Sequence, residues 1–82
     1  MMTICGYKRN EFVAKDTGAV IGGYTIYVTE ERKNVVGHAV DSFFVSDGCL
    51  ARSDLGASDL MVDEPVEILY NKYGKIATIK LG

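Results

Sequence analysis

Aromatic and basic side chains occur together in two short stretches of the sequence, and this combination is suited to binding a flexible polyanion. The residues of the first stretch are Tyr7, Lys8, Arg9, Phe12 and Lys15, and those of the second are Tyr70, Lys72, Tyr73 and Lys75. Exposed rings stack on unpaired bases, while Lys and Arg neutralise the phosphates between them. The residue types therefore indicate non-catalytic binding of single-stranded nucleic acid, with DNA as the first candidate.

Tyr73 and Tyr27 are the two rings best suited to stacking. Tyr73 lies in a turn between Lys72 and Lys75, and the geometry of a turn requires no tyrosine. Tyr27 alternates onto the face of its strand opposite the predicted core residue Ile26. We predict that the nucleic-acid-binding residues are Lys8, Arg9, Lys15, Tyr27, Lys72, Tyr73 and Lys75. The alternative is that the tyrosines pack in the core or at the rim of a small barrel.

The formal net charge of -2 hides an uneven distribution of charge along the chain. Residues 1–33 and 72–82 together carry eight basic and four acidic side chains, a net charge of +4. Residues 34–71 carry one basic and seven acidic side chains, a net charge of -6. A fold that brings the two ends together would have a mildly basic side and an acidic side. Scattered solubilising charge is the alternative explanation.

The sequence offers little for catalysis or metal binding. His38 is the one histidine, and although Asp41 follows it, no nucleophile in a recognisable motif accompanies them. An acidic cluster lacks the alternating ligand spacing of a calcium loop; its members are Asp59, Asp63 and Glu64. Cys5 and Cys49 have no Cys or His companions of the kind that a zinc site needs. We therefore expect no enzymatic activity, no catalytic residues, no metal and no cofactor.

The length of the chain, 82 residues, fits one small domain spanning residues 1–82. A domain of this size buries only about 60% of its unfolded surface, so it gains from sheet closure or from a second copy, and we expect a homodimer. No stretch approaches the roughly 20 apolar residues of a membrane helix. The opening residues lack the basic start and apolar run of a signal peptide. We expect a cytoplasmic protein with no membrane partner and with both cysteines as free thiols.

Five segments rich in β-forming residues are separated by turns. The predicted strands are 7–14, 19–29, one within 35–45, 66–70 and 75–81. Asn71 and Gly74 supply the chemistry of the last turn, and Gly22-Gly23 predicts a bulge or bend in the second strand. Residues 49–63 read as an irregular connection with a short helical turn. Alternation predicts a core face in the second strand, formed by Tyr24, Ile26 and Val28. It also places Val66, Ile68 and Tyr70 on one face of the fourth strand, and Ala77, Ile79 and Leu81 on one face of the fifth.

This order of strands and helix is that of the oligonucleotide-binding barrel. We predict an all-β fold, a five-stranded small barrel that is OB-fold-like, with a short helical turn between strands three and four. The loops after strands one and four border the binding face of such a barrel, so the tyrosines and the basic ends should converge there. An SH3-like barrel is the alternative, because it is also built from short strands.

The layout resembles that of the small single-strand DNA-binding proteins of phages and mobile elements, of which the filamentous-phage replication protein is the best-known type. The likeness covers a long first hairpin at residues 7–29, a central strand and a terminal hairpin at residues 66–75. The resemblance implies a homodimer that coats DNA without sequence preference. It also implies DNA contacts at Arg9, Lys15, Tyr27 and Tyr73.

A protein-interaction module is the competing hypothesis. An exposed sheet edge, or a surface around Phe43-Phe44, would dock onto a protein partner or a second copy. This hypothesis explains the acidic middle of the chain better than nucleic acid binding does.

Overall fold

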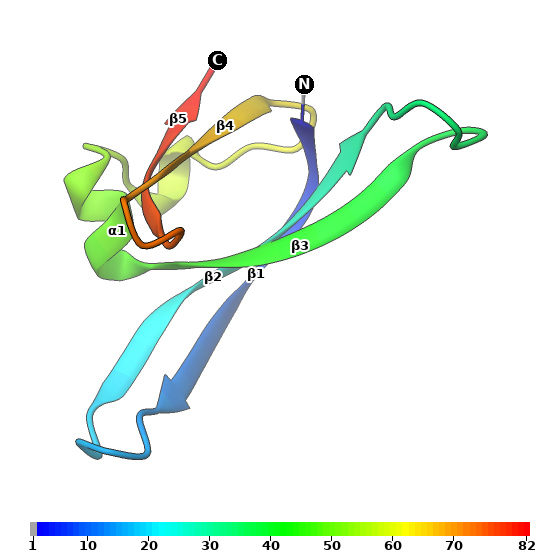
Figure 1. Ribbon diagram of the computed structural model, residues 1–82. Helices are drawn as coiled ribbons and strands as arrows, with labels where there is room; N and C mark the ends of the chain where they lie inside the picture. Colours follow the sequence, from blue (N-terminus) through cyan, green and yellow to red (C-terminus); the bar gives the residue numbers. More distant parts are fainter. Residues whose placement is uncertain (1) are drawn as a thin grey trace.

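The computed structural model describes residues 2–82, which form one antiparallel sheet of five strands in the order β3-β2-β1-β4-β5 (Figure 1). The strands are β1 (Met2–Val13), β2 (Val20–Glu30), β3 (Ala39–Ser46), β4 (Pro65–Tyr70) and β5 (Ile76–Leu81). Between β3 and β4 the chain forms the helix α1 (Asp47–Arg52) and the single 3-10 turn η1 (Ala57–Asp59). The prediction of an all-β chain with a short helical turn between the third and fourth strands is confirmed.

The sheet is open, because within residues 2–82 no strand pairing joins β3 to β5. Side chains from α1 and the residue after it cover the free edge of β5 instead. The Cys49 thiol and Nε of Arg52 donate hydrogen bonds to the carbonyl oxygen of Ala77, at 3.4 and 3.2 Å. The Ser53 hydroxyl accepts a hydrogen bond from the backbone N–H of Ile79 at 2.9 Å. These side chains make some of the hydrogen bonds to the β5 backbone that a neighbouring strand would otherwise make. Closure into a barrel stays a prediction.

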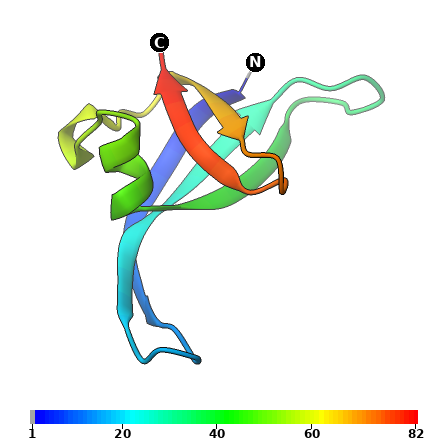
Figure 2. The same cartoon turned by 60° about the vertical axis from the view of Figure 1, so that its left-hand side comes forward.

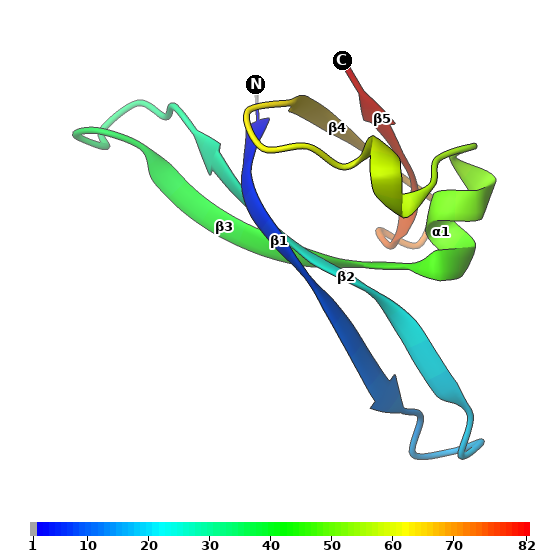
Figure 3. The same ribbon diagram turned by 180° about the vertical axis from the view of Figure 1, so that it is seen from behind.

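β1 and β2 form a long hairpin that extends beyond the rest of the protein (Figures 1 and 3). β1 begins at Met2, well before the predicted start at Tyr7. A bulge at Cys5 breaks the alternation of side chains there, which conceals the strand in the sequence. Of the two possibilities predicted at Gly22-Gly23, a bulge or a bend, the bulge is wrong, since the pairing of β1 with β2 is regular at those two residues.

The core lies between the β1–β2–β3 part of the sheet and a cover formed by β4, β5 and α1 (Figure 2). Along β2, Ile26 and Val28 are buried and Tyr24 is half-buried against them, as the alternation predicts. The buried apolar residues come from every layer: Ile4, Ile26, Val28, Val45, Cys49, Leu50, Leu60, Val66 and Ile79. Each fully buried aliphatic side chain contributes about 1.5–3 kcal/mol to folding.

β3 starts inside the predicted stretch 35–45 and ends one residue beyond it, at Ser46. It starts only at Ala39 because Asn34 and Gly37 take positive φ angles of 69° and 88° and turn the chain within the loop 31–38. At its other end, Ser46 caps α1, since its hydroxyl accepts a hydrogen bond from the Cys49 N–H at 3.1 Å. The Ser-Asp-Gly run at residues 46–48 therefore begins a helix.

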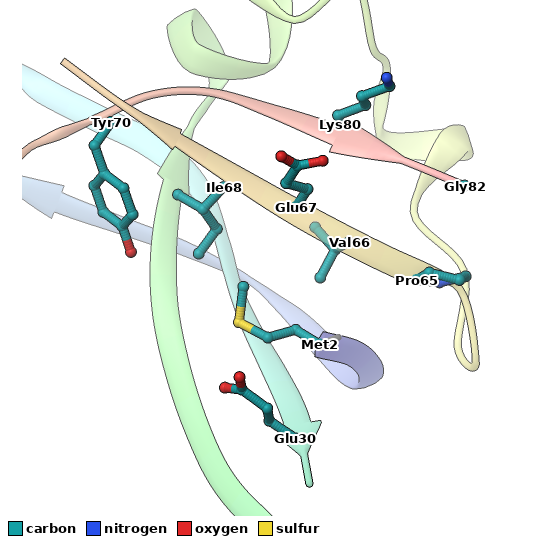
Figure 4. A pocket seen from close by; sticks show the side chains of 9 residues that line it. All are labelled: Met2, Glu30, Pro65, Val66, Glu67, Ile68, Tyr70, Lys80 and Gly82. Carbon is teal, nitrogen blue, oxygen red and sulfur yellow. The ribbon is translucent and has the colours of Figure 1, made fainter. Parts of the chain in front are cut away.

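The β4–β5 hairpin is the element that the sequence predicted best. Oδ1 of Asn71 accepts hydrogen bonds from the backbone N–H groups of Tyr73 and Lys75, at 2.9 and 3.1 Å, and Gly74 takes a φ of 76°. Tyr70 lies on the same side of β4 as Val66 and Ile68, as the alternation predicts (Figure 4). It is nevertheless 60% exposed, at the end of the strand where the register shifts after Leu69.

Cys5 and Cys49 are free thiols, the first exposed and the second buried. In the part of the chain that the structure describes, no helix has the length and apolar character needed to cross a membrane.

Candidate nucleic-acid interface

One side of the β1–β2–β3 layer faces away from the core, and we call it the outer face. Because side chains alternate along a strand, the neighbours of buried residues such as Ile26 and Val45 lie on it. Its members include Lys8, Asn10 and Phe12 from β1, Thr25 and Tyr27 from β2, and Ser42 and Phe44 from β3.

Two phenylalanines of the outer face meet across the strand between them. The ring centroids of Phe12 in β1 and Phe44 in β3 are 5.2 Å apart with an interplanar angle of 63°. Gly23 of β2 makes this contact possible, because a Cβ at that position would lie 2.7 Å from Cζ of Phe44 and would collide with the Val45 carbonyl oxygen. Phe12 is 48% exposed, so the pair remains open to a flat ligand.

Tyr27 and Lys8 lie beside this pair. The strand register places Lys8 opposite Thr25 and Thr25 opposite Phe44, while Tyr27 is opposite Ser42. Diagonal neighbours on one face of a sheet are roughly 7–8 Å apart, within reach of long and aromatic side chains. Tyr27 is half-buried and Lys8 is exposed, which agrees with the predicted outward direction of Tyr27.

The outer face is also free of carboxylates, as far as the described residues of β1, β2 and β3 show. The acidic residues of these strands are Glu11, Glu30 and Asp41, and each lies on the inner side, the same side as the core residues. Asn10, Thr25 and Ser42 supply amide and hydroxyl groups, and Nδ2 of Asn10 donates a hydrogen bond to Oγ1 of Thr25. Ile21 and Val40 are apolar residues of the same face. The result is a neutral to weakly positive surface with three aromatic rings, which suits stacked bases.

Arg9 is placed differently from Lys8, because consecutive strand residues face opposite sides. On the inner side its guanidinium donates to both carboxylate oxygens of Asp47, with NH1 to Oδ1 at 2.6 Å and NH2 to Oδ2 at 2.9 Å. It also lies over the ring of Tyr24, 5.3 Å from the centroid. The mutual hydrogen bonds raise the pKa of Arg9 above its ordinary value and lower the pKa of Asp47 below its own.

Lys15 lies in the exposed loop 14–19 at the tip of the β1–β2 hairpin. The hairpin that carries Lys15 also carries Phe12, Lys8 and Tyr27. Four sequence-predicted residues, Lys8, Arg9, Lys15 and Tyr27, therefore belong to one protruding element (Figure 1).

Lys72, Tyr73 and Lys75 form a second, separate group in the β4–β5 turn. Tyr73 is 74% exposed, as predicted, and Nζ of Lys72 lies 5.2 Å from its ring centroid. The β4–β5 hairpin covers the inner side of the β1–β2–β3 layer (Figure 2). Met2 of β1 pairs with Val66 and Val66 pairs with Leu81 of β5, so β4 lies between the two ends of the chain. The structure does not bring Tyr73 onto the face of Tyr27, and the predicted convergence of both tyrosines with the basic ends on one face is not found.

Phe12, Phe44 and Asn10 were not among the predicted binding residues. Alternation with buried Val45 was a signal that could have placed Phe44 outward. The contact between Phe12 and Phe44 had no signal in the sequence, because it depends on the register of three strands.

A second feature is the free edge of β4 on the side away from β5. β1 pairs with β4 at Met2↔Val66 and Thr3↔Pro65, and within the described chain residues 68–70 lie beyond this pairing. A cavity of about 380 Å³ opens beside them, and its apolar lining includes Met2, Val66 and Ile68 (Figure 4). Figure 4 shows these three side chains on one side of β4 and Glu67 on the other.

Residues 2–82 contain no group of three or more His, Cys, Asp or Glu side chains placed to hold a metal ion. His38 is exposed in the loop before β3 and lines a small depression with Glu30 and Glu31. Comparisons with protein-family models, with curated proteins and with solved structures found no match for this chain.

Proposed function

We propose that this protein binds single-stranded nucleic acid, DNA in the first instance, without catalysing a reaction. The observation that carries the proposal is the outer face, where Phe12, Phe44 and Tyr27 adjoin Lys8 and where the described strands place no carboxylate. Each base that stacks on such a ring contributes roughly 1–3 kcal/mol to binding. Two or three stacked bases give useful affinity without a strongly positive surface.

The arrangement of the strands supports an OB-fold-like barrel as the framework of this interface. The order β3-β2-β1-β4-β5 needs only a β3–β5 pairing to close, and α1 lies between β3 and β4. In OB-folds the face of strands two and three and the loops after strands one and four bind the ligand. In this chain that face is the outer face, and the loop after β1 carries Lys15. The loop after β4 carries Tyr73, which lies apart from the outer face in the hairpin that covers the inner side. The likeness in layout to phage single-strand DNA-binding proteins points the same way and favours a cytoplasmic site of action.

Titration of a fluorescent oligonucleotide at low salt tests the proposal. We expect saturable binding whose affinity falls with salt, with a slope of about -0.7 for each phosphate neutralised. Few lysines border the outer face, so the slope should be shallow. Absence of binding at about 100 µM protein would overturn the proposal, because non-specific binders usually reach that range.

A protein-interaction function is the second candidate, and the free edge of β4 favours it. Unpaired N–H and C=O groups at residues 68–70 can accept another strand, and Leu69 and Tyr70 beside them are exposed. We propose a second copy of the chain as the partner, since an antiparallel pair of identical edges is self-complementary.

Light scattering on the purified chain shows whether β4 pairs with a second copy or is free for a different protein. A dimer that Leu69→Lys converts to a monomer supports pairing through β4. If the chain stays monomeric at high concentration, the partner of the β4 edge would have to be a different protein. A pull-down that recovers one protein even after nuclease treatment would then identify it.

A further inference from the structure

The ion pair between Arg9 and Asp47 joins the protruding hairpin to the start of α1 across 38 residues of sequence. Both guanidinium nitrogens and both carboxylate oxygens take part, which is the paired fork geometry of arginine and carboxylate. Glu11 accepts a third, longer hydrogen bond at 3.4 Å. The arginine is thus held in place by a carboxylate from another element.

β2 is shaped to admit this pair. Gly22 lies opposite Glu11 in the strand register, and a Cβ at residue 22 would collide with the guanidinium of Arg9 and lie 3.1 Å from Oδ2 of Asp47. On the other side of the guanidinium, the Tyr24 ring provides a flat surface. Gly22 and Gly23 therefore have separate tasks, since one makes room for the ion pair and the other for Phe44.

The pair is open to solvent, with 44% of the Arg9 side chain and 54% of the Asp47 side chain exposed. Exposed ion pairs contribute little to stability, because water and salt screen the charges. A phosphodiester presents two anionic oxygens to a guanidinium in the same fork geometry as a carboxylate. Replacing the Asp47 carboxylate by a phosphodiester therefore costs the protein little free energy of folding.

The position of Arg9 brings it within reach of a strand bound to the outer face. On the side away from β2, Ile4 exchanges backbone hydrogen bonds with Asp63 and Glu64. In the part of the chain described, no strand pairs with residues 7–13 on that side, so they form an edge of the sheet. Lys8 lies on the outer side of this edge and Arg9 on the inner side. A single strand that crosses the edge meets both side chains.

We propose that Arg9 is a phosphodiester-binding residue and that Asp47 occupies its guanidinium in the absence of nucleic acid. The proposal rests on the proposed function and adds that a carboxylate of the protein itself competes with the phosphate for Arg9. Asp47 sets the affinity by holding the arginine, and a bound strand releases Asp47 when its phosphate takes that place.

The test compares oligonucleotide affinity for the wild-type chain, Asp47→Asn, Arg9→Gln and the double variant. Asp47→Asn should bind severalfold more tightly at low salt, and the gain should shrink as salt screens the wild-type pair. Arg9→Gln should bind more weakly, with a salt slope shallower by about 0.7, the loss of one phosphate contact. In a chain that already carries Arg9→Gln, Asp47→Asn should raise the oligonucleotide affinity only by the amount expected from removing one negative charge.

Asp54→Asn is the matched control. Asp54 is exposed, lies outside the hairpin and has a φ of 59° that asparagine also adopts. Its substitution changes the net charge by the same amount without freeing Arg9. Thermal melting of each variant checks that the fold is kept.

Equal affinities for Asp47→Asn and Asp54→Asn, or wild-type binding by Arg9→Gln, would overturn the assignment while leaving nucleic acid binding itself intact. Failure of the wild-type chain to bind any oligonucleotide would remove the proposed function and this inference together.

Discussion

Phe12 and Phe44 belong to strands that are not neighbours, and their rings still touch edge to face, 5.2 Å between centroids. The strand between them contributes Gly23 at this point, so no side chain separates the rings. An exposed pair of this kind gains little for the stability of the free protein compared with a buried one, and it presents a ready surface for a base.

Phe12→Ala should therefore weaken oligonucleotide binding while leaving the fold intact. We expect a loss of about 1–3 kcal/mol, or roughly 5- to 150-fold in affinity, measured by fluorescence anisotropy. Phe44→Ala should have a similar effect, and the double variant should lose less than the two single losses combined because the rings touch. Tyr70→Ala is the control, since it removes an exposed ring that lies off the outer face. An equal loss for Tyr70→Ala would place the interface elsewhere.

Gly23→Ala tests the space beneath Phe44. A methyl group there would meet the ring of Phe44 and the Val45 carbonyl, and backbone cannot move aside as a flexible side chain can. We expect destabilisation of about 1–3 kcal/mol, the usual cost of overpacking, measured by urea denaturation. Gly48→Ala in α1 is the control, because its Cβ would be 3.7 Å from its nearest neighbour and alanine favours helix. Wild-type stability for Gly23→Ala would show that Phe44 lies elsewhere in solution.

The elements that the sequence predicted well are those whose signals are local. Asn71 and Gly74 identified the β4–β5 turn because the side-chain oxygen of Asn71 closes it, and alternation around Ile26 identified the inner side of β2. Residues 2–6 were missed because the bulge at Cys5 breaks the alternation. The open sheet could not be foreseen, because it depends on α1 side chains reaching β5, 25 to 28 residues away in sequence.

For the candidate site, too, the features that could be predicted are those with a local signal in the sequence. The outward direction of Tyr27 and the exposure of Tyr73 follow from local pattern, and the structure agrees with both. The engagement of Arg9 by Asp47 depends on where α1 begins, and residues 38 apart carry no mutual signal in a single sequence. The two glycines at residues 22 and 23 were noticed as a pair, but their reason lies in neighbours that only the folded chain provides.

The carboxyl group of Asp47 should titrate below its ordinary pKa of 3.8, because Arg9 donates hydrogen bonds to the charged form. A carboxylate with a lowered pKa in the folded state stabilises the protein above its unfolded pKa. That contribution is lost as the pH falls through the folded pKa. Carbon-13 NMR of the side-chain carboxyl groups measures the midpoint, and Arg9→Gln should raise it towards the ordinary value. An unchanged midpoint in Arg9→Gln would mean that the ion pair does not form in solution.

Ser53→Ala should destabilise the protein through the edge of β5. The Ser53 hydroxyl accepts a hydrogen bond from the backbone N–H of Ile79 at 2.9 Å and donates one to the Cys49 carbonyl oxygen at 2.8 Å. Because Ile79 is buried, its N–H would lose its partner without gaining water, at a cost of about 1–3 kcal/mol. Urea denaturation measures the loss, and hydrogen exchange should show faster exchange at the Ile79 amide. Ser58→Ala, an exposed serine in η1, should change stability little. If the two variants were equally stable, the edge of β5 would have to be held by other groups, and pairing with β3 in a closed barrel would be the first alternative to examine.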